Sequence, residues 1–203
     1  MAGIGEVDFR QIPGKANEIQ QLGGQLNSEL SSAWNSVNEL RGTWHGLRYN
    51  ELISYFNKVT DDVNKMIKLV VNEIPEALGR VASNYAKAEQ TSVAPVGTAS
   101  ITPIPTLSDS DTSTMAFQSA EAANVRALVN KNFSNSEGYM NDIESTFRSI
   151  TWQSDAKNAF ENRISALKSQ IVEALNTINS QFTKLMQQSQ SDIEGAEKAN
   201  TVD

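Results

Sequence analysis

The sequence predicts an all-α protein in which two helical hairpins pack into a four-helix bundle, an intramolecular pseudo-dimer. Three observations support this fold: few turn-forming residues, apolar residues that recur every three or four positions, and a second copy of the same pattern later in the chain. The chain has 203 residues with only 11 Gly and 5 Pro, which is low for an all-β protein with many turns. Helices are therefore the expected building blocks.

The later part of each half predicts one long helix, because apolar residues spaced by three and four positions share one helical face. These residues are Leu52, Phe56, Val59, Val63, Ile67, Val70, Ile74, Leu78 and Tyr85 in the first half, and Phe160, Ile164, Leu167, Ile171, Leu175, Ile178, Phe182, Met186 and Ile193 in the second. A further helix precedes each one, at 19–40 and at 125–147. The breaks at 41–47 and 149–155 are short, so consecutive helices should form antiparallel hairpins.

The two halves repeat at an offset of 108 residues. This shift superimposes the nine apolar positions and also pairs the Thr-Trp dipeptide ending at Trp44 with the one ending at Trp152. Helical periodicity does not explain the matching tryptophans, so we predict an internal duplication. The predicted organisation is a hairpin at 1–90, a linker at 91–114 and a second hairpin at 115–203.

The linker holds three of the five prolines among Ser, Thr and Gly. Proline lacks a backbone donor and restricts φ, so residues 91–114 cannot be helix interior. Such a segment reaches roughly 80 Å when fully stretched but spans only about 27 Å as a random coil. Antiparallel packing of the hairpins therefore needs an extended linker, and the sequence leaves open whether the hairpins pair within one chain or exchange between two chains.

Several local features refine the helices. Pro75 falls inside the second helix and predicts a kink near Asn72. Gly23-Gly24 should weaken the first helix, by about 1 kcal/mol per glycine relative to alanine. Trp34 lies next to the apolar stripe and is expected to pack on its flank. The predicted N-caps are Asp8, Ser119 and Ser154.

Composition argues against several classes of function. The net charge is −7 with no Lys/Arg stripe, so a nucleic-acid interface is not expected, and attraction to an anionic membrane surface is not expected either. The chain has no Cys and a single His, His45, so we expect no metal, no cofactor and no enzyme activity. Residues 1–15 lack the charge and apolar core of a secretory signal peptide, and no apolar run is long enough for a transmembrane helix.

The turn of the first hairpin reads Trp44-His45-Gly46. A hairpin of this length with Trp-X-Gly at its turn resembles the WXG family, the small helical proteins exported by bacterial type VII secretion systems. The resemblance implies that Gly46 permits a tight turn and that Trp44 packs at the end of the bundle. The second half keeps Trp152 but has Ser154 in place of the glycine, so it resembles a degenerate copy.

A second motif, Tyr85 followed four residues later by Glu89, is similar to the Tyr-X-X-X-Asp/Glu export signal of type VII substrates. This spacing places both side chains on one helix face, one turn apart. The second half has Ile193 and Glu197 at these positions, so no second signal is assigned. Hairpins of this family commonly pair antiparallel, which implies that Trp152 lies near Tyr85 and Glu89 and forms a composite recognition surface with them.

The resemblance therefore implies a non-enzymatic secreted substrate, or an export partner, of a type VII secretion system. Such a protein would be cytoplasmic before export and secreted without a leader. Its partners would be the secretion ATPase and a co-secreted protein. Two alternatives stay open: an intracellular helical adaptor or scaffold, and a secreted effector that acts on membranes. An enzyme is the least supported interpretation.

Overall fold

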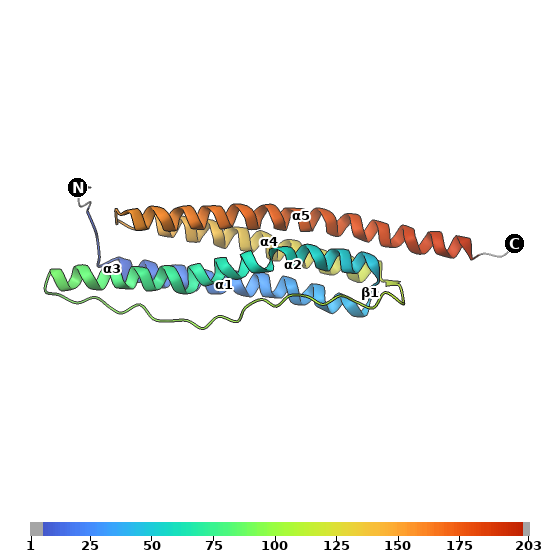
Figure 1. The fold of residues 1–203 in the computed structure, drawn as a ribbon, viewed down its shortest axis with the longest axis horizontal. Coiled ribbons are helices and arrows are strands. Elements are labelled where there is room, and N and C mark those ends of the chain that lie inside the picture. Colours follow the sequence, from blue (N-terminus) through green and yellow to red (C-terminus); the bar gives the residue numbers. More distant parts are fainter. Residues whose placement is uncertain (1–5, 201–203) are drawn as a thin grey trace.

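The computed structural model describes residues 6–200, and it confirms the predicted all-α bundle (Figure 1). Two hairpins make up the bundle. Hairpin 1 consists of α1 (Ile12–Glu39), a 3-10 turn (Leu40–Gly42), α2 (Leu47–Lys68), a π-helical segment (Leu69–Glu73) and α3 (Ile74–Ala88), and hairpin 2 consists of α4 (Ser119–Arg148) and α5 (Asp155–Ala199). Two short strands, β1 (Trp44–His45) and β2 (Ala116–Phe117), pair antiparallel at one end.

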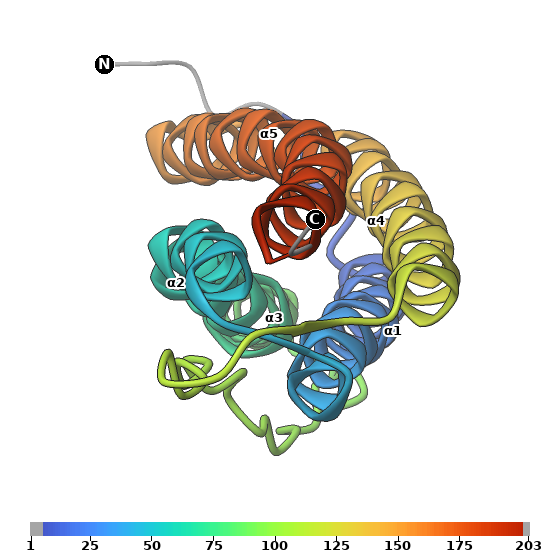
Figure 2. The same ribbon diagram turned by 90° about the vertical axis from the view of Figure 1, so that its right-hand side faces the viewer.

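The two hairpins pack side by side, and their helices surround a common axis (Figure 2). Helix α1 packs mainly on α4, and α2 packs mainly on α5. The ion pair between Arg48 and Asp192 lies near one end of the α2–α5 interface, and the pair between Glu73 and Arg163 lies further along it. Residue numbers rise along α2 and α3 while those of their partners on α5 fall, so the two hairpins are antiparallel. The turn of each hairpin therefore lies beside the open end of the other hairpin.

The core lies between four long helical segments, which are α1, the continuous segment from α2 to α3, α4 and α5; each segment is called a rod below. The core is made by the apolar stripes predicted from the sequence. In hairpin 1, every stripe residue from Leu52 to Leu78 is buried, and in hairpin 2 the centre of the stripe from Ile164 to Phe182 is buried apart from the half-buried Leu167. Trp34 is fully buried, and its ring centroid lies 4.8 Å from that of Phe56 in an edge-to-face arrangement. Its indole N–H donates to Thr60 Oγ1 at 3.1 Å. The expectation that Trp34 packs against the stripe is confirmed.

The predicted break near Asn72 is confirmed as the π-helical segment Leu69–Glu73. Pro75 has no N–H to donate to Val71 O, four residues earlier, and its ring crowds that carbonyl. The π-helical turn widens the helix at this point. Gln20 of α1 satisfies the freed carbonyl, since its Nε2 donates to Val71 O at 2.9 Å. The hydrogen bond that Pro75 cannot make within its own helix is therefore replaced by one from Gln20 of α1.

Helix α1 remains continuous through Gly23-Gly24. A Cβ placed on Gly23 would lie 2.7 Å from Val71 Cγ2 and 2.8 Å from Val70 Cγ2, whereas a Cβ on Gly24 would meet nothing within 4 Å. Both valines are buried and are stiff at χ1. Gly23 thus permits the close approach of α1 to the π-helical segment, and Gly24 has no such role.

Two of the predicted N-caps are wrong. Helix α1 follows Gln11 and α4 follows Gln118, and neither residue makes a side-chain capping bond. The backbone N–H of Asp8 instead donates to Thr151 O at 3.1 Å. This contact with the opposite hairpin holds Asp8 ahead of the helix, so tertiary structure overrides the local preference, and Ser119 lies inside α4 as its first residue.

The linker is docked along the bundle rather than free. It contains no helix between Gln90 and Met115 and runs beside hairpin 1 from the end of α3 to β2 (Figure 1). Its inward-facing residues are Val93, Val96, Ala99, Ile101, Ile104, Leu107 and Ser110. This spacing is close to every third residue, the period of a polyproline II helix. The linker therefore contributes to the packed structure.

We predict opposite effects from alanine at the two neighbouring glycines. Gly24→Ala should stabilise the protein by up to about 1 kcal/mol through helix propensity. Gly23→Ala gains the same propensity but forces a methyl group against stiff valines, which costs about 1–3 kcal/mol. Chemical denaturation of the two variants should therefore differ by about 1–3 kcal/mol in the free energy of unfolding. Equal stability would contradict the close approach at Gly23.

Candidate interaction site

The turn of hairpin 1 is built around Gly46. This residue has φ +111°, a backbone conformation that glycine adopts readily and other residues rarely do. Its N–H donates to Ser110 Oγ at 2.9 Å, so the linker closes over the turn. The backbone conformation provides a physical reason for glycine two residues after Trp44.

Trp44 lies inside the interface between the hairpins and is only 1% exposed. Its ring centroid is 5.2 Å from that of Phe117 and 5.8 Å from that of Phe182, both from hairpin 2 and its entry strand. Its indole N–H donates to Ser189 Oγ of α5 at 3.0 Å. The side chain is therefore covered by hairpin 2 and is not available as a surface anchor for another protein.

Polar contacts surround this buried indole. The Arg48 Nε donates to Asp192 Oδ2 at 2.9 Å, and hydrogen bonds to Asp192 and then Glu51 raise the pKa of Arg48. The Tyr49 hydroxyl donates to Val37 O at 3.0 Å, and burial raises the pKa of Tyr49 to about 12. These contacts link α2 to α5 and to α1 at this end of the bundle.

The strand pair continues the closure. Trp44 pairs with Phe117 and His45 with Ala116, and the N–H of Gln118 donates to Thr43 O at 3.0 Å. His45 is half-buried in this pair. Among residues 6–200, no three His, Asp or Glu side chains are grouped as a metal site would require. His45 thus contributes its backbone to the contact between the turn of hairpin 1 and β2.

The turn of hairpin 2 has a different construction. Ser154 accepts a hydrogen bond from the N–H of Lys157 at 3.0 Å, which confirms the predicted N-cap of α5. Trp152 is 6% exposed. The Thr151 carbonyl accepts the N–H of Asp8, just as the Thr43 carbonyl accepts the N–H of Gln118. Each turn thus receives a backbone hydrogen bond from the segment that leads into the other hairpin, as in a two-fold arrangement.

The Tyr85 and Glu89 motif lies at the end of α3, away from the Trp44 turn (Figure 1). Tyr85 is half-buried and Glu89 is exposed. The helix ends at Ala88, and the chain reverses at Gln90, where φ is +54°. Both side chains remain accessible to a partner that approaches this end.

Trp152 lies at the same end of the bundle as Tyr85. The Glu73–Arg163 ion pair serves as the reference point. At a rise of 1.5 Å per residue, Tyr85 lies roughly 18 Å beyond Glu73 along α3. The turn that holds Trp152 lies at a similar distance from Arg163, beyond the start of α5. The shared end agrees with the antiparallel geometry, and a composite surface that joins the two residues stays a prediction.

Sequence reasoning missed the hydrogen-bond partners of the Trp44-His45-Gly46 turn. Ser189 lies 145 positions from Trp44 and Ser110 lies 64 positions from Gly46 in the chain, and neither serine belongs to a recognisable motif. Their serine hydroxyls are buried, but serine in a polar chain gives no signal of burial. Only the fold brings them to the turn.

A comparison with protein-family models identifies a match over residues 6–90 to the family WXG100, described as "Proteins of 100 residues with WXG". The match covers hairpin 1 with its Trp44-His45-Gly46 turn and ends at Gln90. The chain matches no curated protein and no solved structure. Among residues 6–200, no helix is both long and apolar enough to cross a membrane.

We predict that the hydrogen bond between Trp44 and Ser189 stabilises the pairing of the hairpins. Ser189→Ala leaves the buried indole N–H without an acceptor, which costs about 1–3 kcal/mol. Ser191→Ala is the matched control, because Ser191 is exposed on the same helix. Denaturant titrations should give a lower free energy of unfolding for Ser189→Ala than for Ser191→Ala. Identical curves would mean that the bond contributes nothing.

Proposed function

Because its first hairpin, residues 6–90, matches the model of the WXG100 family, we propose that this chain is a non-enzymatic substrate or export partner of a bacterial type VII secretion system. The match associates the protein, as a small helical protein, with type VII secretion. The specific role is our proposal. The observation that supports it most is the burial of the Trp44 turn against a second hairpin supplied by the same chain.

Hairpin 2 acts in this proposal as the built-in partner of hairpin 1. Helices α4 and α5 cover the apolar faces of α1 and α2, and the Arg48–Asp192 ion pair and the Trp44–Ser189 hydrogen bond set the register. Fusion of both hairpins in one chain raises the effective concentration of the partner. The chain would therefore need no separate partner hairpin before export, and residues 115–203 would be a degenerate copy of the first unit.

Recognition by the secretion machinery would take place at the end of α3. Tyr85 and Glu89 are accessible there, whereas Trp44 at the other end is covered. A groove on the secretion ATPase could receive this helical face with its aromatic and acidic side chains one turn apart. Trp152 lies at the same end, so its turn would flank the docking surface. The protein would be cytoplasmic before export and would leave the cell through the type VII system, alone or with a co-secreted protein.

The membrane-active alternative has less support. The apolar faces that would enter a bilayer are buried between the two hairpins, and the net charge of −7 gives no attraction to anionic lipids. The adaptor alternative has the same fold and differs only in the absence of export, so an export assay separates it from our proposal.

A secretion assay in the native bacterium tests the proposal. We expect wild-type protein in the culture medium only when the type VII ATPase is present. Tyr85→Ala should reduce the secreted amount at least tenfold, on the order of the loss of one well-packed aromatic anchor, with an unchanged cytoplasmic level. Tyr139→Ala is the matched control, since Tyr139 is also half-buried but lies on α4, and it should be secreted normally.

Two results would contradict the proposal. Export of the wild type without the ATPase would exclude type VII secretion, and a wild type that never leaves the cell would favour the adaptor. Normal secretion of Tyr85→Ala would remove Tyr85 from the recognition surface. Circular dichroism of both tyrosine variants should confirm that neither has lost its helices.

A further inference from the structure

Hairpin 1 carries a row of asparagines that holds the linker by its backbone. These three side chains, which we call the asparagine ladder, project from α2 at intervals of seven residues. Each one both donates to a linker carbonyl and accepts from the N–H of the same linker residue. The pairs are Asn50 with Ser110 (3.1 and 2.7 Å), Asn57 with Leu107 (2.9 and 2.7 Å) and Asn64 with Ile104 (2.9 and 2.9 Å).

The spacings of the ladder and of the linker match physically. Seven residues of α-helix advance about 10.5 Å, and three residues of polyproline II chain advance about 9.3 Å. The bonded linker residues are spaced by three and run in the opposite direction to α2. Only an extended chain with a three-residue period satisfies all three asparagines, so the ladder selects both conformation and register.

Side chains of the linker support the same register. Ile104, Leu107 and Ser110 are 2%, 8% and 7% exposed, so the residues held by the ladder also point inward. Pro103 and Pro105 are exposed on either side of Ile104. Because the ladder uses no N–H at these two positions, proline costs no hydrogen bond there and favours the extended conformation.

Helix α1 contributes two further contacts to the same segment. Gln20 Nε2 donates to Gly97 O at 3.1 Å, and Asn27 Nδ2 donates to Thr102 O at 3.4 Å. Both are hydrogen bonds from a side chain to a backbone carbonyl of the linker, so they do not depend on the side chain of the linker residue. The surface that binds the linker therefore extends over both rods of hairpin 1.

We propose that this surface is a register-specific binding site for an extended chain, and that its occupation by residues 97–110 of the same chain makes the two hairpins pair within one molecule. The inference goes beyond the proposed function and does not depend on export. It addresses the question that the linker length leaves open, namely pairing in one chain or exchange between two chains.

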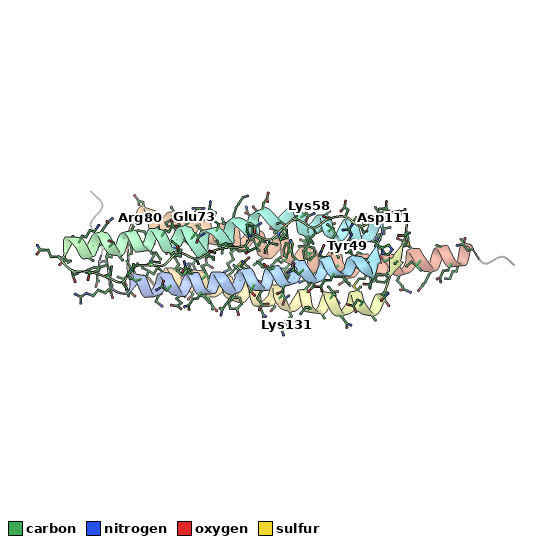
Figure 3. The ribbon with its side chains drawn as sticks, turned by 90° about the horizontal axis from the view of Figure 1, so that it is seen from below. Tyr49, Lys58, Glu73, Arg80, Asp111 and Lys131 are labelled. Atoms are coloured by element: carbon green, nitrogen blue, oxygen red, sulfur yellow. The ribbon has the colours of Figure 1, made fainter. Side chains whose placement is uncertain are left out.

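Geometry explains why the docking matters. The linker begins after α3 at one end of the bundle, whereas α4 begins at the other end, beside the Trp44 turn. Asp111 and Tyr49 mark this second end in Figure 3. The rod from Leu47 to Ala88 is about 60 Å long at 1.5 Å per residue, whereas a free linker of this length spans about 27 Å on average.

A linker shorter on average than the distance it must span gives a low effective concentration of the tethered partner. Docking on the ladder holds the linker at the required extension and places β2 beside β1. Hairpin 2 then begins next to its own hairpin 1, and α4 can fold back along α1 of the same chain. Without the docking, hairpin 2 of a second molecule would compete more effectively for the same apolar face.

The test uses the full chain with the ladder removed. The ladder variant carries Asn50→Ala, Asn57→Ala and Asn64→Ala, and its control carries Asn124→Ala, Asn135→Ala and Asn162→Ala at exposed helix positions of hairpin 2. Each protein is unfolded in denaturant and refolded over a range of concentrations. The dimeric fraction is measured by size exclusion with light scattering, and protection of the linker amides by hydrogen exchange.

We expect the wild type and the control to refold as monomers. In the ladder variant, the amides of Ile104, Leu107 and Ser110 should exchange at least about tenfold faster, the result of losing one net hydrogen bond at each. Its dimeric fraction should rise severalfold with refolding concentration. Unchanged amide protection would overturn the proposal, as would faster exchange without added dimer, or a wild type that refolds mainly as a dimer.

A second pair of variants leaves every helix untouched. Leu107→Pro removes the N–H that Asn57 accepts, and Thr106→Pro changes an exposed neighbour whose N–H is outside the ladder. Leu107→Pro should also increase the dimeric fraction, and Thr106→Pro should not. Equal dimeric fractions for the two variants would overturn the proposal even if the ladder variant failed to fold.

Discussion

Each hairpin has an apolar stripe that its own two rods cannot cover on both sides, and this constraint determines most of the structure. A hairpin alone would leave one side of the stripe in water, at about 25 cal/mol per Å² of apolar surface. The antiparallel pairing of hairpin 1 with hairpin 2 removes that exposure along α1–α4 and α2–α5. The Trp44 turn, the linker and several local defects are all arranged around this pairing.

The pairing gives the bundle two different ends. At one end, Trp44 is enclosed by Phe182 and Ser189 of the partner hairpin, and the linker closes over Gly46. At the other end, Tyr85 and Glu89 stay accessible beside the turn of hairpin 2. The side chain of Trp44 is therefore covered by a hairpin of the same chain. Export recognition, as proposed, is concentrated at the accessible end.

Defects in one element are offset by contacts from another. Pro75 removes a helical hydrogen bond, and Gln20 supplies the missing donor to Val71 O. Gly23 weakens α1 locally but lets it approach the π-helical segment. The linker, which has no secondary structure of its own, is held by the asparagine ladder. These compensating contacts connect α1, the segment from α2 to α3 and the linker, and they make the register of the bundle specific.

The sequence by itself determined the all-α class, the positions of the rods, the break at Pro75 and the N-cap at Ser154, because helical periodicity, proline geometry and capping act over a few neighbouring residues. The Trp44-X-Gly46 pattern also indicated the resemblance of hairpin 1 to the WXG family, whose model matches residues 6–90. The tertiary structure alone decided that Asp8 and Ser119 do not cap, that Trp44 bonds Ser189, and that the linker is docked on Asn50, Asn57 and Asn64. These outcomes depend on groups far apart in the chain, where no local pattern shows which partner a polar side chain will meet.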